Sequence, residues 1–134
     1  MVLADGAGTP LGIHLAAATP SEVKLVEPTL ESLPDKGQPE RLIADKGYDS
    51  NPLRAWLAAR DIEPIIPARV NNRVATHQDG RQLRRYRKRW IIERTNSWLQ
   101  NFRRLVVRYE RRATNFIALV HLACALITLN KVFG

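Results

Sequence analysis

Two short apolar runs separated by a helical segment constrain the fold of this chain more than any other feature. The first run, residues 41–44, ends at Asp45 and a glycine turn, and the second, residues 63–66, is closed by a proline. Between them, Asp49 or Ser50 is suited to cap a helix that has a proline in its first turn, where the missing N–H costs nothing. A strand, a helix and a strand in this order predict parallel strands joined by a right-handed crossover. We therefore expect an α/β fold.

The start of the chain has the pattern of a hairpin followed by a helix. Residues 2–4 and 11–17 are short strand-like segments that flank the glycine-rich turn DGAGTP. Residues 20–33 predict a helix with Ser21 as its N-cap, weakened or kinked at Pro28.

Two further helices are predicted near the C-terminus. Over residues 83–109 an apolar stripe recurs at helical spacing, with a polar, arginine-flanked face about opposite that carries Glu93. Residues 114–131 are apolar on nearly all sides, so this helix should be buried against the long one, with His121 and Cys124 as core residues rather than ligands. The stripe comprises Ile91, Ile92, Thr95, Trp98, Leu99, Phe102, Leu105, Val106 and Tyr109, and the polar face comprises Tyr86, Arg89, Glu93, Asn96, Gln100 and Arg104.

Size and composition indicate one domain, residues 1–134, with residues 68–82 as a linker or insertion. The chain is 45% hydrophobic, enough to build a core without disulfides, and its single cysteine excludes a disulfide framework within the chain. A reducing cytoplasm suits this composition. The most apolar stretch, residues 116–129, is interrupted by His121 and Thr128, so no membrane segment is predicted.

Positive charge is concentrated in residues 69–112. This segment holds 14 Lys or Arg, 13 of them Arg, against three acidic residues, whereas the net charge of the whole chain is only +8. A solvated helix face is the usual explanation of a charge run, but the arginine fork suits phosphate, and this density favours nucleic acid as the partner.

Asp45 at a strand end and Glu93 on a helix are the candidate catalytic carboxylates. Phosphodiester cleavage by two Mg²⁺ ions needs carboxylates from separate elements, because no single helix or strand can surround both ions. Each residue also has an ordinary role open to it, Asp45 as a turn cap and Glu93 as the i,i+4 partner of Arg89. Their combination with the cationic segment favours metal-dependent chemistry on DNA.

Residues 1–133 resemble the C-terminal part of bacterial insertion-sequence transposases of the DDE class, most closely the group named after insertion sequence five. LIADKGYDS, followed by LRAWLAARDIEPIIP, is similar to the region around the second catalytic aspartate of that family, which would be Asp45. YRKRWIIERTNSWLQNFRRL is similar to its glutamate signature, whose spacing Tyr86, Arg89 and Glu93 match. Gln100 stands where a lysine is usual, so a phosphate contact there would be a hydrogen bond rather than a charge contact.

The resemblance implies an RNase H-like mixed sheet flanked by helices, with a long basic helix and an apolar C-terminal helix. In that fold the hairpin corresponds to strands two and three, so the first strand and its catalytic aspartate are expected upstream of Met1. Asp5 is the only early aspartate and would be an unusual third carboxylate.

The resemblance to these transposases further implies that Asp45 and Glu93 bind Mg²⁺ (or Mn²⁺) as cofactor. It also implies DNA transposition as the function. DNA, both transposon ends and target, is the expected partner, together with an upstream transposase segment or a homo-oligomer. The expected DNA-binding residues are Tyr86, Arg89, Gln100, Arg103, Arg104, Arg85 and Lys88.

Two other functions stay open on the sequence. A non-catalytic DNA-binding or regulatory fragment would need the arginines but no metal. A protein-interaction fragment would rely on Trp90, Trp98 and the apolar last helix, and would bind DNA weakly.

Overall fold

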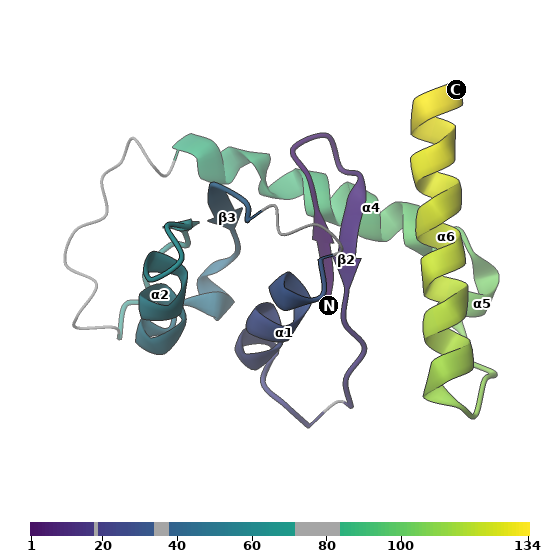
Figure 1. Cartoon of the computed structure of the whole chain (residues 1–134), viewed down its shortest axis with the longest axis horizontal. Coiled ribbons are helices and arrows are strands. Elements are labelled where there is room, and N and C mark those ends of the chain that lie inside the picture. The colour runs from purple at the N-terminus through teal and green to yellow at the C-terminus, as the bar shows by residue number, and fades with distance from the viewer. Residues whose placement is uncertain (18, 34–37, 72–83) are drawn as a thin grey trace.

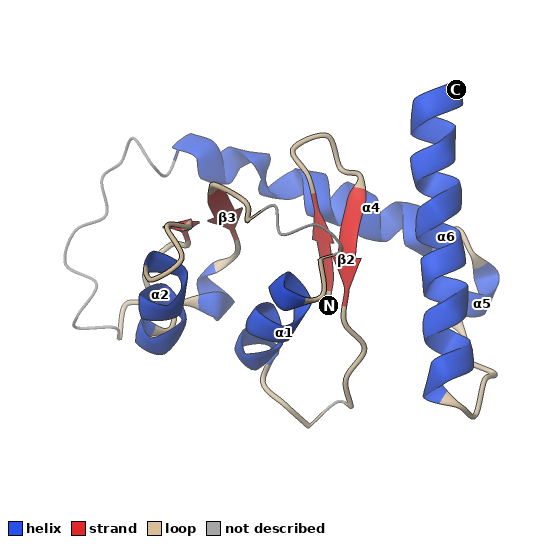
Figure 2. Ribbon diagram, viewed as in Figure 1, coloured by secondary structure: helices blue, strands red, loops and turns tan. Residues whose placement is uncertain are grey.

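The computed structural model describes residues 1–17, 19–33, 38–71 and 84–134. Figures 1 and 2 show three parts side by side: the α2 and β3 region, a central hairpin with α1, and α6 with α5. Helix α4 connects the first part to the last. The elements are β1 (Val2–Ala4), β2 (Pro10–Ile13), η1 (Glu22–Leu25), α1 (Val26–Glu31), β3 (Arg41–Ile43), η2 (Lys46–Tyr48), α2 (Asn51–Ala58), β4 (Glu63–Ile65), η3 (Arg87–Arg89), α4 (Trp90–Gln100), α5 (Arg103–Val106) and α6 (Ala113–Phe133).

The predicted hairpin is confirmed, although its second strand is shorter than expected. β1 and β2 pair antiparallel, and β2 ends at Ile13 rather than at residue 17. Asp5 closes the turn, because its Oδ1 accepts hydrogen bonds from the N–H groups of Ala7 (2.9 Å) and Thr9 (2.7 Å). Gly8 has a φ of 85°, a conformation that glycine adopts without strain.

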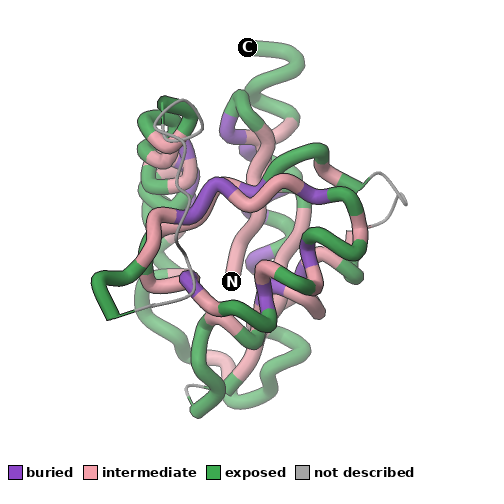
Figure 3. Tube along the Cα trace, turned by 90° about the vertical axis from the view of Figure 1, so that its left-hand side faces the viewer, coloured by how far each residue is buried: buried purple, intermediate pink, exposed green. Residues whose placement is uncertain are grey.

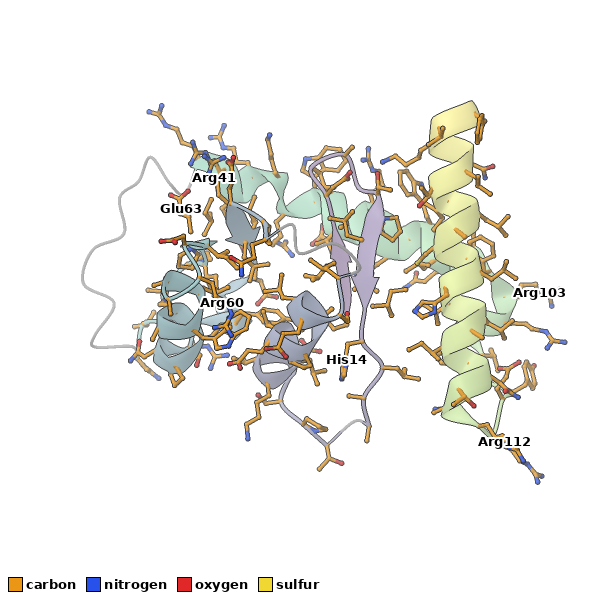
Figure 4. The ribbon with its side chains drawn as sticks, in the orientation of Figure 1. His14, Arg41, Arg60, Glu63, Arg103 and Arg112 are labelled. Carbon is orange, nitrogen blue, oxygen red and sulfur yellow. The ribbon has the colours of Figure 1, made fainter. Side chains whose placement is uncertain are left out.

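The predicted β-α-β unit is also confirmed. β3 and β4 pair in parallel, and α2 lies between them in the chain. Arg41 and Glu63 face each other across the two strands in Figure 4, with Arg41 Nε 2.9 Å from Glu63 Oε2. The unit is packed on an apolar cluster of buried side chains, Val26, Leu42, Leu53, Leu57, Ile62 and Ile66.

A second apolar cluster lies between α4 and α6, and the hairpin connects the two. Successive side chains of a strand point to opposite faces, so Leu3 packs on the first cluster while Val2 packs on the second. Figure 3 shows buried positions alternating with exposed ones along the helices. The second cluster comprises Leu99, Val120, Ala123, Cys124 and Ile127.

The prediction of one helix over residues 83–109 is wrong. Residues 84–86 are helical, η3 and α4 follow, and the helix ends at Gln100. Phe102 is extended (φ −85°, ψ 100°) and α5 starts after it. The reason is packing: the break lets Phe102 and Leu105 join the cluster under α6. Val106 and Tyr109, predicted on the apolar stripe, are consequently 60% and 75% exposed.

α6 extends the predicted helix by a few residues, and the prediction that it is buried holds for one face only. Cys124 is buried as expected, and burial raises the pKa of its thiol. His121 was predicted in the core and is exposed, so that prediction is wrong. By length and composition α6 could cross a membrane. Core helices of soluble proteins can share both properties, so the expectation of no membrane segment stays a prediction.

Candidate active site

Asp45 and Glu93 line the same cavity, of about 480 Å³. The cavity lies among β1, η1, β3 with its following loop, and α4, so it brings together segments far apart in the chain. Its polar side chains are Glu22, Asp45, Tyr48, Arg89, Glu93 and Asn96.

Asp45 is held by the turn that follows β3. It is the N-cap of η2, and its Oδ1 accepts a hydrogen bond of 2.5 Å from the Gly47 N–H, which fixes the direction of the carboxylate. A Cβ on Gly47 would lie 2.6 Å from Asp45 Oδ1, so only glycine fits without rearrangement. The capping role that the sequence suggested for Asp45 is therefore present at the cavity wall.

The buried side chain of Asp49 holds the same loop in place through hydrogen bonds. Asp49, whose side chain is 0% exposed, accepts from Arg54 Nε (2.8 Å) and from the Arg69 N–H (2.7 Å). Arg69 in turn donates from Nε to the Lys46 carbonyl (2.9 Å) and from Nη2 to the Gly47 carbonyl. Ser50 is the N-cap of α2, without a side-chain hydrogen bond. Asp49 thus connects α2, the segment after β4 and the turn that carries Asp45.

Glu93 projects from the first turn of α4 and is paired with Arg89. Arg89 Nη1 lies 2.6 Å from Glu93 Oε1, and the two side chains are 38% and 55% exposed. α4 is fixed against the hairpin by Thr95, which is fully buried and donates to the Gly8 carbonyl at 2.9 Å. Glu93 is thus the i,i+4 ion-pair partner of Arg89 and also lines the cavity.

Glu22 and Tyr48 are cavity residues that the sequence reasoning missed. Tyr48 Oη donates to Glu22 Oε2 at 3.1 Å. Burial, then this hydrogen bond and the negative charges of Glu22 and Asp45, raises the pKa of Tyr48 to about 12. Tyr48 could have been found, because it belongs to ADKGYDS. Glu22 could not, since an acidic residue in a first helical turn carries no functional signal of its own.

Asp5 lies elsewhere, in the hairpin turn, and lines a second cavity of about 580 Å³. Burial favours the neutral form of its carboxyl, but hydrogen bonds from Thr9 and Ala7 and the charge of Lys131 outweigh it and lower the pKa of Asp5. Its Oδ1 accepts both backbone hydrogen bonds of the turn.

The donor chemistry of the first cavity suits a hard divalent cation. Mg²⁺ and Mn²⁺ prefer carboxylate oxygens, which Asp45, Glu93 and Glu22 offer. Over the described ranges, no group of three or more His, Cys, Asp or Glu side chains is arranged to hold a metal ion. Asp45, Glu93 and Glu22 therefore share a cavity, but among the described residues they are not arranged as a metal site.

The predicted DNA-binding residues fall into two groups. Arg85, Lys88 and Arg89 line the second cavity, and the Arg89 guanidinium lies 5.8 Å from the ring centre of Tyr86. The lining of the two cavities does not include Gln100, Arg103 or Arg104. Figure 4 shows Arg103 at the far end of the molecule from Arg41, beyond α6, and Arg104 is paired with Glu110 at 3.3 Å. Arg85 is itself paired with Glu63 at 3.3 Å.

Both cavities lie between the two sheets. Leu3 and Leu42, from β1 and β3, line each of them. In the described parts of the chain, β1 pairs only with β2 and β3 only with β4. Among the described residues, one edge of each sheet therefore faces the cavities without a strand partner.

A family model described as "Transposase DDE domain" matches residues 1–128, and the chain belongs to that family. The predicted relationship to insertion-sequence DDE transposases is confirmed, while the group within them stays a prediction.

Two relatives support this assignment. The chain is 37% identical to "Putative transposase for insertion sequence element IS402" of Burkholderia cepacia, over 98% of this chain and 62% of the relative. It is 31% identical to "Putative transposase for insertion sequence element IS6501" of Brucella ovis, over 93% of this chain and 92% of the relative. The chain thus spans less than two thirds of the first relative. No solved structure is a significant match.

Proposed function

We propose that this chain forms part of a transposase catalytic domain that cuts and joins DNA strands during DNA transposition in the bacterial cytoplasm. The observation that carries the proposal is the meeting of Asp45 and Glu93 in one cavity, from elements widely separated in the chain. Membership of the transposase DDE domain family supports it.

Asp45 and Glu93 are the proposed metal ligands. A bound Mg²⁺ or Mn²⁺ would polarise the phosphodiester and lower the pKa of water. The Gly47 N–H orients the Asp45 carboxylate beforehand, so less conformational freedom is lost on binding. Arg89 neutralises Glu93 in the unbound protein and can turn to a DNA phosphate when a cation takes its place.

The proposed DNA path follows the basic residues before α4. Arg85, Lys88 and Arg89 border the second cavity and would hold phosphates, which position DNA but carry little sequence information. For Gln100, Arg103 and Arg104 to contribute, the DNA must continue along α4 to α5. Tyr86, in contact range of Arg89, would orient that arginine.

An RNase H-like architecture requires one more strand, between β1 and β3. The strand edges of β1 and β3 that face the cavities can pair with this additional strand. The additional strand would carry the first catalytic aspartate, which is expected upstream of Met1. We propose that an upstream transposase segment supplies this strand.

Binding of Mn²⁺ by the full chain is the first test. Titration calorimetry should show binding that Asp45→Asn and Glu93→Gln each weaken about tenfold or more. Glu31→Gln is the matched control, because Glu31 is exposed, outside the cavity, and 4.0 Å from Arg60. Equal affinity in all four proteins would remove the two carboxylates from the site.

Nicking of supercoiled DNA and DNA affinity separate catalysis from binding. Any metal-dependent nicking should disappear in Asp45→Asn and Glu93→Gln, while DNA affinity stays close to that of the wild type. The affinity itself should fall by orders of magnitude between about 50 and 200 mM salt. Salt-insensitive, weak binding would instead indicate a protein-interaction fragment.

A further inference from the structure

Arg94 and Lys131 bring two positive charges together at the turn of the hairpin. Arg94 Nη2 donates to the Ala7 carbonyl at 2.7 Å, and Lys131 Nζ donates to the same oxygen at 2.5 Å. The two nitrogen atoms are therefore at most about 5 Å apart. Figure 1 shows the hairpin turn beside α4 and the C-terminal half of α6, the helices that carry these two side chains. We call Arg94, Lys131 and the turn between them the turn site.

The positive charge of the turn site is only partly neutralised. In the parts of the chain that the structure describes, neither Arg94 nor Lys131 forms an ion pair with a carboxylate. Asp5 is the acidic residue of the turn, and the charge of Lys131 contributes to its lowered pKa. One negative charge against two positive charges leaves the turn site cationic.

The guanidinium of Arg94 is held between two tryptophan rings and keeps unused donors. Its central carbon lies 4.7 Å from the ring centre of Trp90 and 4.8 Å from that of Trp98. Its Nε is buried without a hydrogen-bond partner, and its Nη1 donates to none of the described residues. A charged group that is poorly hydrated and already oriented loses little water and little conformational freedom when it binds an anion.

The spacing and chemistry of the two cations suit one phosphate group. Charge-assisted hydrogen bonds are about 2.7–2.9 Å long, so two nitrogen atoms this close can both reach the oxygens of the same phosphate. The guanidinium offers a planar fork and the ammonium a point charge. The approach is open at Gly6, where an added Cβ would meet no atom within 4 Å.

We propose that Arg94 and Lys131 together bind one phosphate of a DNA backbone at the turn site. The inference rests on the proposed function, because it takes DNA as the partner, and it extends that function to two residues that line neither cavity. Asp5 and Gly6 of the turn line the second cavity, so a DNA strand that passes along this cavity continues over the turn to the turn site. The contact adds affinity and fixes the position of the strand, but it reads no sequence.

The salt dependence of DNA affinity tests the proposal. Fluorescence anisotropy of a labelled short duplex of arbitrary sequence measures the affinity of the full chain between about 50 and 200 mM salt. The double variant Arg94→Gln/Lys131→Gln should bind at least about fivefold more weakly at the lower salt concentration. Its slope of log affinity against log salt should be shallower by about 0.9, the value for one phosphate.

Three further variants separate the phosphate contact from a structural role and from general charge. Lys131→Gln keeps a donor for the Ala7 carbonyl and should still weaken DNA binding, whereas Lys131→Arg keeps the charge and should bind like the wild type. Lys24→Gln/Arg112→Gln is the matched control, because it removes the same charge at two exposed positions outside both cavities. This control should keep the wild-type slope.

Far-ultraviolet circular dichroism checks the folding of each variant, and Lys131→Gln, at an exposed position, keeps the test valid if Arg94→Gln does not fold. Salt-sensitive DNA binding that Lys131→Gln and the double variant both retain would overturn this inference and leave the proposed function standing. A wild type without salt-sensitive DNA binding would overturn both. An equal loss of slope in the control would assign the effect to general charge, and displacement of the duplex by micromolar inorganic phosphate would assign the turn site to free phosphate instead.

Discussion

Replacing Asp49 by alanine should destabilise the protein by about 3 kcal/mol. The buried carboxylate accepts from Arg54 Nε at 2.8 Å and from the Arg69 N–H at 2.7 Å. Removing one partner of a buried charge pair costs about 3–5 kcal/mol. The lower end applies here, because Arg54 is 24% exposed and keeps its hydrogen bond to the Ile66 carbonyl at 2.6 Å.

Urea unfolding followed by tryptophan fluorescence measures this loss. The midpoint should fall with the denaturant slope unchanged, since the surface exposed on unfolding stays the same. Asp49→Asn keeps an acceptor without the charge and should lose roughly half as much free energy. Glu31→Gln, at an exposed ion pair, should change it by less than about 0.5 kcal/mol.

The same variant should also weaken Mn²⁺ binding, because Asp49 positions Arg69, which holds the turn behind Asp45. A loss below about 1 kcal/mol for Asp49→Ala would refute the reasoning, since it is within the range of ordinary substitutions. An unchanged Mn²⁺ affinity in a destabilised variant would show that the turn keeps its shape without this anchor.

Two further predictions concern the hairpin turn and the tyrosine of the cavity. Gly8→Ala should cost about 2–3 kcal/mol in the same unfolding assay, because φ is 85° and the new Cβ would lie 2.9 Å from Arg94 Nη2; a loss near zero would mean that the turn rearranges freely. Ultraviolet titration should show Tyr48 ionising near its raised pKa of about 12, and Glu22→Gln should lower this pKa, since the charge that opposes ionisation is gone. The raised pKa stabilises the fold fully below pH 10, the ordinary tyrosine value, and this contribution is lost as the pH rises through about 12. A Tyr48 pKa that does not move in Glu22→Gln would contradict the contribution of the Glu22 charge.

The elements that were predicted correctly from short sequence patterns are those whose contacts join residues close together in the chain. The hairpin and the β-α-β unit were predictable because glycine turns and strand-helix-strand order leave few topologies. The helix predicted over residues 20–33 is divided into the 3-10 helix η1 and the short helix α1, and Pro28 lies in the first turn of α1, where its missing N–H breaks no bond within α1.

Long-range packing decided the rest. Helical spacing alone continues past Phe102, and only the cluster under α6 explains why the chain bends there. Composition likewise could not show that one face of α6 stays exposed, which left His121 on the surface. Sequence patterns predicted that Asp45 and Glu93 belong to one site. No sequence pattern predicted Glu22, which lines the same cavity because of how the chain folds. The metal and DNA roles of these residues remain predictions.

The contacts of α4 with the hairpin determine when the cavity can form. Thr95 bonds the Gly8 carbonyl and Arg94 bonds the Ala7 carbonyl, each across 87 residues of chain, whereas the loop of Asp45 is held by contacts within about two dozen residues. Short-range contacts close faster than long ones, so the Asp45 loop can fold while α4 is still unfolded. During synthesis the hairpin and the β-α-β unit also leave the ribosome first. The two carboxylates are therefore brought together by the long-range contacts of α4, and a partly synthesised chain has Asp45 without Glu93.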